Sequence, residues 1–378
     1  MITTQFNFKS FKAFGEKFLQ QLTTELIDLK IPAHALECDH LCYRVVSFEE
    51  YGFYKKALIL HGKLLTEAVV NGRPICTFLL TEPFQTETHI VKLIELPAPK
   101  TGANYASGFE HAEFILKESF DQFTAKFPNL TFSLAGNQTI NPELCLKLNE
   151  KQVKFHYQSL KRVIEIEQAK ITDIIFDFDG TLVKSRENIY EVNRIVFSEA
   201  LDREVTIQEA IEKFHPEFPK LFEAFDITCP IKKSKAISSW GTVSARFSYE
   251  LFAGVQDLLA ELRSQGFRFH LWTARDEFSA RKILKSHQIE HLFSSLSFAT
   301  DTISKPCANS LNFNWQSIGQ NQVLVVGDSA TDIVGAKNIQ AIAGAVFWDT
   351  HSKYKSLVAA GAELFFYKPS DLKNWLIK

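Results

Sequence analysis

Two aspartates that directly follow an apolar run form the stretch of this sequence best suited to chemistry. Asp177 and Asp179 are two residues apart, so the alternating geometry of an extended chain turns both carboxylates the same way. Gly180 allows a sharp turn after them, and Thr181 can bond the exposed backbone. Crowded carboxylates repel unless one is protonated or a cation lies between them. The spacing therefore predicts a magnesium-assisted reaction with an aspartate nucleophile.

Four further polar residues follow predicted strands later in the chain. Thr273 stands where a hydroxyl beside exposed backbone amides can hold a phosphate oxygen. Lys305 can supply a fixed positive charge against a phosphate and a nucleophile. Asp328 and Asp332 are four residues apart at a strand-to-helix turn, so both can reach one hard cation. Polar residues at successive strand ends, in this order, predict one catalytic site.

A second set of potential ligands lies in the first half of the chain. His40 and His111 are 71 residues apart, and Glu95 and Glu165 are 70 residues apart. Each half of a repeat would therefore offer one histidine on its first strand and one glutamate on its last. Two histidines and two glutamates suit zinc, iron, nickel or manganese.

The elements that must position these ligands form a repeat after a helix expected over residues 10–29. A strand, a helix and three strands are expected twice, over residues 40–46, 47–57, 62–70, 73–80 and 89–96, and over 110–116, 118–127, 143–149, 152–158 and 160–167. Glu113 shares a strand face with His111, and Glu167 with Glu165, so spacing alone does not choose the glutamate. The matched offset favours Glu165.

The second half alternates strands and helices, which predicts an α/β fold. Strands are expected over residues 172–176, 267–272, 296–299, 322–326, 344–348 and 363–367. Helical patterns with proline breakers interrupt this alternation over about 184–250, which predicts an inserted helical cap. A short polar junction at 168–170 separates the two halves.

The composition bounds the class of protein. A length of 378 residues predicts two or three domains, and a net charge of −2 argues against a nucleic-acid partner. The N-terminus lacks signal-peptide features and no apolar run is long enough for a bilayer, so we expect no membrane partner. Scattered cysteines suggest reduced thiols and a cytoplasmic location. The oligomeric state stays open.

The first half resembles the vicinal-oxygen-chelate, or glyoxalase-like, superfamily, whose paired βαβββ modules place metal ligands at these points. More closely, residues 1–168 look like the YecM family. That resemblance is carried by Asp39-His40 and by the segments NGRPI at 71–75, IELPAP at 94–99 and GFEHAE at 108–113. It implies a metal-binding α+β domain with a transition metal held by His40, Glu95, His111 and Glu165.

The second half, residues 171–378, resembles phosphatases of the haloacid dehalogenase superfamily with a helical cap between the first two motifs. The motifs are DxDGT at 177–181, Thr273, Lys305 and GDxxxD at 327–332. The resemblance implies that Asp177 forms an aspartyl-phosphate and that Asp179 acts as general acid and then as base. Dehalogenases of the superfamily lack the second acid of the first motif, so Asp179 favours phosphoryl transfer.

The same resemblance assigns the remaining residues. It implies that Thr273 and Lys305 hold the phosphoryl group of a small phosphorylated metabolite. It implies that Asp328, with Asp332, binds Mg²⁺ beside Asp177 and the Asp179 carbonyl. We therefore expect a glyoxalase-like domain followed by a capped, Rossmann-like phosphatase. The alternatives are a phosphomutase or phosphotransferase, and a non-enzymatic first half that senses a metal or metabolite.

Overall fold

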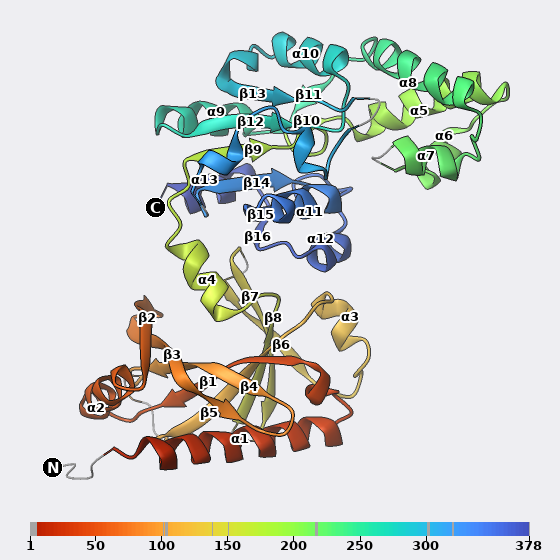
Figure 1. Cartoon of the computed structure of the whole chain (residues 1–378). Helices are drawn as coiled ribbons and strands as arrows, with labels where there is room; N and C mark the ends of the chain where they lie inside the picture. Colours follow the sequence, from red (N-terminus) through yellow and green to blue (C-terminus); the bar gives the residue numbers. More distant parts are fainter. Residues whose placement is uncertain are drawn as a thin grey trace. The chain divides into compact units, whose positions relative to one another are not determined.

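The computed structural model describes residues 6–100, 102, 105–137, 139–149, 151–215, 218–300, 303–319 and 321–377. The chain divides into two compact parts, Met1–Gln168 and Ala169–Lys378, which we call unit 1 and unit 2 (Figure 1). Each unit has its own sheet and its own buried core, so each is described by itself.

Unit 1 is built on an eight-stranded sheet with the strand order β2-β3-β4-β1-β5-β8-β7-β6. The strands are β1 (Glu37–Arg44), β2 (Gly62–Val70), β3 (Arg73–Gln85), β4 (Ile90–Pro97), β5 (Gly108–Ile115), β6 (Phe132–Asn137), β7 (Asn141–Leu148) and β8 (Lys151–His156). Helix α2 (Phe48–Ile59) follows β1, and α3 (Phe120–Thr124) follows β5. The two first strands, β1 and β5, pair antiparallel at the centre with Leu41 opposite Ala112. The predicted pair of βαβββ modules is confirmed.

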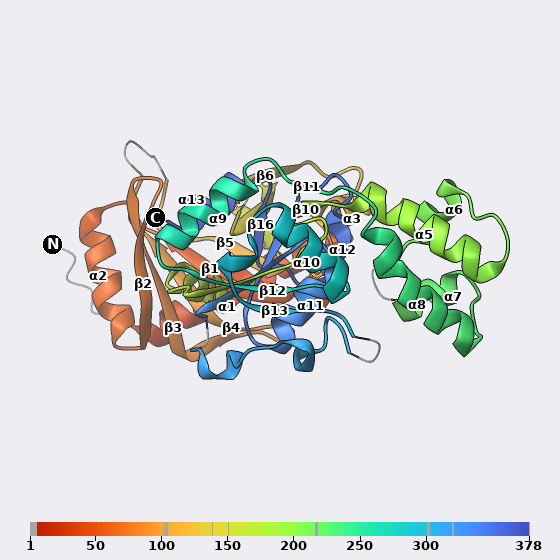
Figure 2. The same ribbon diagram turned by 90° about the horizontal axis from the view of Figure 1, so that it is seen from above.

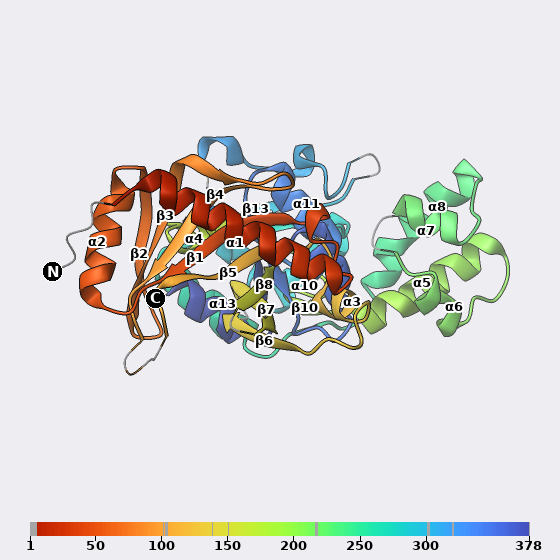
Figure 3. The same ribbon diagram turned by 90° about the horizontal axis from the view of Figure 1, so that it is seen from below.

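Helix α1 (Phe8–Asp28) covers one face of this sheet, as Figures 1 and 3 show. The side chain of Asn7 caps it by accepting from the Ser10 amide at 2.9 Å. Its apolar stripe, including Phe18 and Leu22, is buried in the unit 1 core. Burying each such side chain stabilises the fold by about 1.5–3 kcal/mol. A short 3₁₀ turn, η1 (Ala33–Ala35), then leads into β1.

The prediction of a strand over residues 160–167 is wrong, because Leu160–Glu167 is helix α4. The side-chain oxygen of Ser159 accepts from the Arg162 amide at 3.2 Å and so caps a helix. The residues Val163, Ile164 and Ile166 are buried on its inner side. The last strand of the second module is therefore β8, and its second strand is β6, which the sequence did not predict.

Unit 2 contains a six-stranded sheet with the order β13-β12-β9-β14-β15-β16, in which all neighbouring pairs are parallel. The strands are β9 (Asp173–Phe176), β12 (Arg268–Trp272), β13 (Phe293–Ser297), β14 (Val323–Gly327), β15 (Ile342–Val346) and β16 (Leu364–Phe366). The helices outside the cap are α9 (Val255–Ser264), α10 (Glu277–Ser286), α11 (Ala330–Asn338), α12 (Tyr354–Ala360) and α13 (Pro369–Leu376), with 3₁₀ turns η2 (Glu290–Leu292), η3 (Ala308–Ser310) and η4 (Trp315–Ser317). Strand β9 is wholly buried, as a central parallel strand covered on both faces should be.

The inserted helical cap is also confirmed. It consists of α5 (Arg186–Leu201), α6 (Ile207–Glu212), α7 (Phe218–Ala224) and α8 (Pro230–Ser244), which gather to one side of the unit 2 sheet in Figure 2. These helices enclose a core of their own that includes Val196, Phe197 and Trp240. Two short strands, β10 (Val183–Lys184) and β11 (Glu250–Leu251), pair antiparallel where the chain enters and leaves the cap. Helix α8 begins at Pro230 because proline suits the first turn of a helix.

Among the described residues, no helix combines the length and the hydrophobicity needed to cross a membrane.

Candidate functional sites

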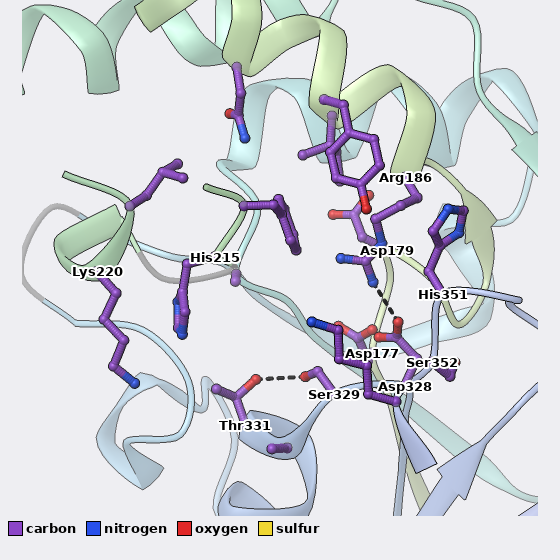
Figure 4. Close-up of a pocket in the computed structure, with 18 of the residues that line it drawn as sticks. Asp177, Asp179, Arg186, His215, Lys220, Asp328, Ser329, Thr331, His351 and Ser352 are labelled. Carbon is purple, nitrogen blue, oxygen red and sulfur yellow. Dashed lines mark hydrogen bonds and ion pairs between the residues drawn. The ribbon is translucent and has the colours of Figure 1, made fainter. Parts of the chain in front are cut away.

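The carboxyl ends of three neighbouring strands bring the predicted residues of unit 2 together. Strand β9 lies between β12 and β14, so Asp177, Thr273 and Asp328 follow adjacent parallel strands. All three line one cavity of about 700 Å³, together with Asp179 and Lys305 (Figure 4). Ligands of open α/β sheets bind at this edge.

The Asp177 carboxylate is held at the floor of this cavity by two donors. Lys305 Nζ lies 2.5 Å from Asp177 Oδ1, and Thr181 donates its hydroxyl to Asp177 Oδ2 at 2.9 Å. Burial and the nearby Asp332 carboxylate raise the pKa of Asp177 to about 7, although Lys305 opposes this shift. The carboxylate is therefore fixed in orientation, with the Lys305 ammonium against one oxygen and the Asp332 carboxylate nearby.

Oxygens of Asp177, Asp328 and Asp332 lie within 4.8 Å of one another. Lys305 Nζ is 2.5 Å from Asp332 Oδ1, and Arg186 Nη2 from the start of α5 is 2.7 Å from Asp328 Oδ2. Burial raises the pKa of Asp328, with Asp177 and Asp332 adding to it and Arg186 opposing it. Three buried carboxylates at this spacing fit a hard divalent cation, which removes their mutual repulsion.

Gly180 is required where the chain turns beside this cluster. It has a φ of +82°, and a Cβ there would lie 2.3 Å from Asp328 Oδ2. Any side chain at position 180 would therefore displace the Asp328 carboxylate.

The Asp179 carboxylate is bound by Arg275, which comes two residues after Thr273. Arg275 Nε is 2.9 Å from Asp179 Oδ2, and Arg275 Nη2 is 2.5 Å from Asp179 Oδ1. Burial alone would raise the pKa of Asp179, but the Arg275 guanidinium outweighs it and the pKa is lowered. Arg275 also donates to the Ser244 hydroxyl at 2.6 Å, at the end of α8. The side chain of Asp179 is thus linked to the cap through one buried arginine.

The sequence did not identify Arg186 or Arg275 as site residues. Arg186 lies 142 positions before Asp328, and nothing in the local pattern marks it. Arg275 could have been suspected from the sequence, because it follows the same predicted strand as Thr273. Figure 4 also shows His215 and Lys220 on the cap side of the cavity, across from Asp177. The cap therefore contributes an imidazole and a lysine ammonium to the cavity.

In unit 1, the structure brings His40, Glu95 and His111 together, with Glu113 in the place predicted for Glu165. Ligand atoms of these residues lie within 4.8 Å of one another. The Glu113 carboxylate is central: its Oε1 is 3.4 Å from His40 Nε2 and 3.2 Å from His111 Nε2. The Glu95 carboxylate lies 3.9 Å from His40 Nε2. Both histidines and Glu113 are buried.

The hydrogen bonds around this cluster suit a metal site. Asp39 Oδ2 lies 2.9 Å from His40 Nδ1 and also accepts from the Leu160 amide at 2.8 Å, so it orients the ring. His40 Nε2 is then free to face Glu113, the arrangement that carboxylates impose on metal-binding histidines. Within the described ranges, neither ring nitrogen of His111 nor Nε2 of His40 makes a hydrogen bond. Buried nitrogens without hydrogen bonds, beside two carboxylates, fit a transition metal.

The prediction of Glu165 as the fourth ligand is wrong. Glu165 lies in α4, its side chain is 39% exposed, and it pairs with Arg162 at 3.4 Å and with Lys161 at 3.8 Å. The predicted role depended on a strand that is a helix. Glu113, which shares a strand face with His111, points into the cluster instead.

Comparison with known families agrees with both resemblances. Residues 8–138 match the family model described as YecM protein, and residues 174–346 match the one described as haloacid dehalogenase-like hydrolase. Protein YecM of Escherichia coli is 26% identical over 35% of this chain and 80% of its own length. The two resemblances that the motifs indicated are confirmed.

Relatives of unit 2 are found among named phosphatases. Phosphoglycolate phosphatase of Synechococcus elongatus is 29% identical over 53% of this chain and 94% of its own length. Pyrophosphatase PpaX of Halalkalibacterium halodurans is 25% identical over 45% of this chain and 80% of its own length.

Proposed function

We propose that unit 2, which is a haloacid dehalogenase-like hydrolase, is a magnesium-dependent phosphatase that forms an aspartyl-phosphate on Asp177. The observation that carries this proposal is the setting of Asp177. Its carboxylate is buried at the cavity floor, fixed by Lys305 and Thr181, with a second carboxylate, Asp179, lining the same cavity. A fixed nucleophile beside a separate acid–base group is what two-step phosphoryl transfer needs.

In the proposed reaction, a carboxylate oxygen of Asp177 attacks phosphorus while the protonated form of Asp179, which the Arg275 ion pair disfavours in the free chain, protonates the leaving oxygen. Asp179 then takes a proton from water, which attacks the aspartyl-phosphate and releases inorganic phosphate. Lys305 and Thr273 neutralise and orient the phosphoryl oxygens. Arg275 holds Asp179 in one orientation between the two steps.

Mg²⁺ would be held by Asp177 and Asp328, with Asp332 beside them and the Asp179 carbonyl as a further ligand. When bound, it neutralises charge on the transferring phosphoryl group. Asp332 accepts from the Ser329 amide at 3.0 Å, so one of its oxygens is already engaged. Asp332 thus serves to orient Lys305 and the turn that carries Asp328.

The substrate class follows from the charges around the cavity. Lys220 and Lys353 line it in addition to Lys305. Phosphoglycolate and pyrophosphate, which appear in the names of the relatives, both carry an anionic group beside the phosphate that is cleaved. We infer a small phosphorylated metabolite with a second anionic group. A phosphomutase or phosphotransferase would use the same aspartyl-phosphate but pass it to a hydroxyl.

The test is a turnover assay across small phosphates with and without metal. Phosphoglycolate and pyrophosphate should be hydrolysed faster than neutral sugar or alkyl phosphates in excess Mg²⁺. Chelation should reduce turnover by at least about a thousandfold, and Ca²⁺ should inhibit because it accepts looser geometry. Full turnover after chelation would rule out the magnesium mechanism. Transfer of phosphate to added alcohol, without release, would favour the phosphotransferase.

A second function is favoured by the unit 1 cluster. We infer that His40, Glu95, His111 and Glu113 bind one transition metal, such as zinc, iron, nickel or manganese. The two buried nitrogens of His111, which face carboxylates but make no hydrogen bond among the described residues, support this inference most directly. A test of whether metal occupancy changes the turnover of unit 2 distinguishes the two roles of the bound metal. A change in turnover indicates sensing, and an unchanged turnover favours catalysis in unit 1.

Replacing a ligand of this cluster should weaken metal binding. His111→Ala and His40→Ala should each weaken zinc binding by at least about a hundredfold, since each removes a direct ligand. Equilibrium zinc binding and elemental analysis of the full chain measure this. Glu165→Ala, and His34→Ala at an exposed histidine in η1, are matched controls outside the cluster and should leave binding unchanged. Binding that survives in both histidine variants would contradict the assignment.

A further inference from the structure

The strand pairing places Lys154 in the second module at the position that Glu95 occupies in the first. Strands β1 and β5 pair antiparallel, with Leu41 opposite Ala112. A two-fold rotation about the midpoint of that pair exchanges the two modules. The rotation superposes His40 on His111 and Cys42 on Glu113. Glu95 on β4 lies opposite Cys42 on β1. The corresponding partner of Glu113 on β8 is Lys154. The structural equivalent of Glu95 in the second module is therefore a lysine.

The Lys154 ammonium contacts the central carboxylate of the cluster. Its Nζ lies 3.1 Å from Glu113 Oε1, the oxygen that also faces His40 and His111. It lies 3.0 Å from Glu143 Oε2 on its other side, and its side chain is only 19% exposed. The lysine therefore neutralises the oxygen that a metal would use.

We propose that Lys154 is a built-in cation that competes with the metal for Glu113 and makes the unit 1 site a weak, exchangeable one. The inference rests on the proposed metal site and assigns a role to a residue outside its ligand set. A fixed ammonium beside the metal position repels a divalent cation, and binding must share or break its contact with Glu113. Glu143 retains the displaced ammonium, so Lys154 stays near the site while the metal exchanges.

The test compares zinc affinity across charge variants of the full chain, by competition with a chromophoric chelator in excess Mg²⁺. Lys154→Gln should bind zinc at least about tenfold more tightly than the parent chain, because one repelling charge is gone. Lys154→Glu, which restores the repeat, should bind at least as tightly as Lys154→Gln. Lys151→Gln, on the same strand but paired with Glu25 at 2.5 Å, is the matched control and should not change affinity.

The outcomes separate this inference from the metal site itself. Unchanged or weaker binding in Lys154→Gln, with zinc still lost in His111→Ala, would overturn the role of Lys154 and leave the site standing. Zinc binding that appears only in the Lys154 variants would support it strongly. Absence of zinc from the parent chain and from every variant would overturn both proposals.

Discussion

Asp177→Asn should reduce phosphatase turnover by at least about ten-thousandfold, because the amide keeps the shape of the side chain but is a poor nucleophile. The loss should appear in kcat, since Lys305 and Thr273 would still bind the phosphoryl group. Initial-rate kinetics with phosphoglycolate in Mg²⁺ measure it.

Stability separates this loss from misfolding. Burial and Asp332 raise the pKa of Asp177 to about 7, so above that pH the charged Asp177 carboxylate lowers the stability of the folded chain. A neutral amide removes this destabilising charge, so the thermal midpoint of Asp177→Asn at pH 8 should not fall below that of the parent. Asp257→Asn, an exposed carboxylate in the first turn of α9, is the matched control and should retain full activity. Substantial turnover by a folded Asp177→Asn chain would exclude Asp177 as the nucleophile.

Lys305→Met should lower both activity and stability. Lys305 is buried and bonds Asp177 and Asp332 at 2.5 Å each, so its removal leaves two buried carboxylates without their shared cation. Breaking a buried ion pair in this way costs about 3–5 kcal/mol of unfolding free energy. Loss of the fixed charge against the phosphoryl group should reduce kcat by a further hundredfold to thousandfold, roughly.

Lys305→Arg is the control, because it keeps the positive charge at this position but changes the geometry of the side chain. It should recover most of the stability and only part of the activity. Excess Mg²⁺ should stabilise Lys305→Met more than the parent, because the cation replaces part of the missing charge. Denaturant unfolding with and without Mg²⁺, alongside steady-state kinetics, gives both quantities. A Lys305→Met chain of parental stability and activity would contradict the role assigned to this lysine.

That the candidate site residues of unit 2 lie together could be predicted from the sequence, because their positions follow from local patterns. Asp177, Thr273 and Asp328 each end an apolar run, and parallel strands put their carboxyl ends at one edge. The partners Arg186 and Arg275 could not be predicted, because long side chains reach across the fold from positions without a local signal.

In unit 1 the repeat was visible in the sequence but its end was not. Residues 164–167 alternate apolar and polar side chains, which fits a strand as well as the end of a short amphipathic helix, and the cap at Ser159 decides for the helix. The 70-residue offset between Glu95 and Glu165 therefore does not indicate structural equivalence of these two residues. The true equivalence of Glu95 and Lys154 depends on strand pairing, which spacing along the chain does not reveal.

Chemical trapping of the phosphorylated chain shows directly whether Asp177 is the nucleophile. Enzyme quenched in acid during turnover of phosphoglycolate is treated with borohydride, which reduces an acyl phosphate to an alcohol, and the peptide containing Asp177 is sequenced by mass spectrometry. We expect homoserine at position 177 in the parent chain, dependent on both substrate and Mg²⁺, with none at Asp179 or Asp328. An unmodified Asp177 during active turnover, or homoserine at another aspartate, would contradict it.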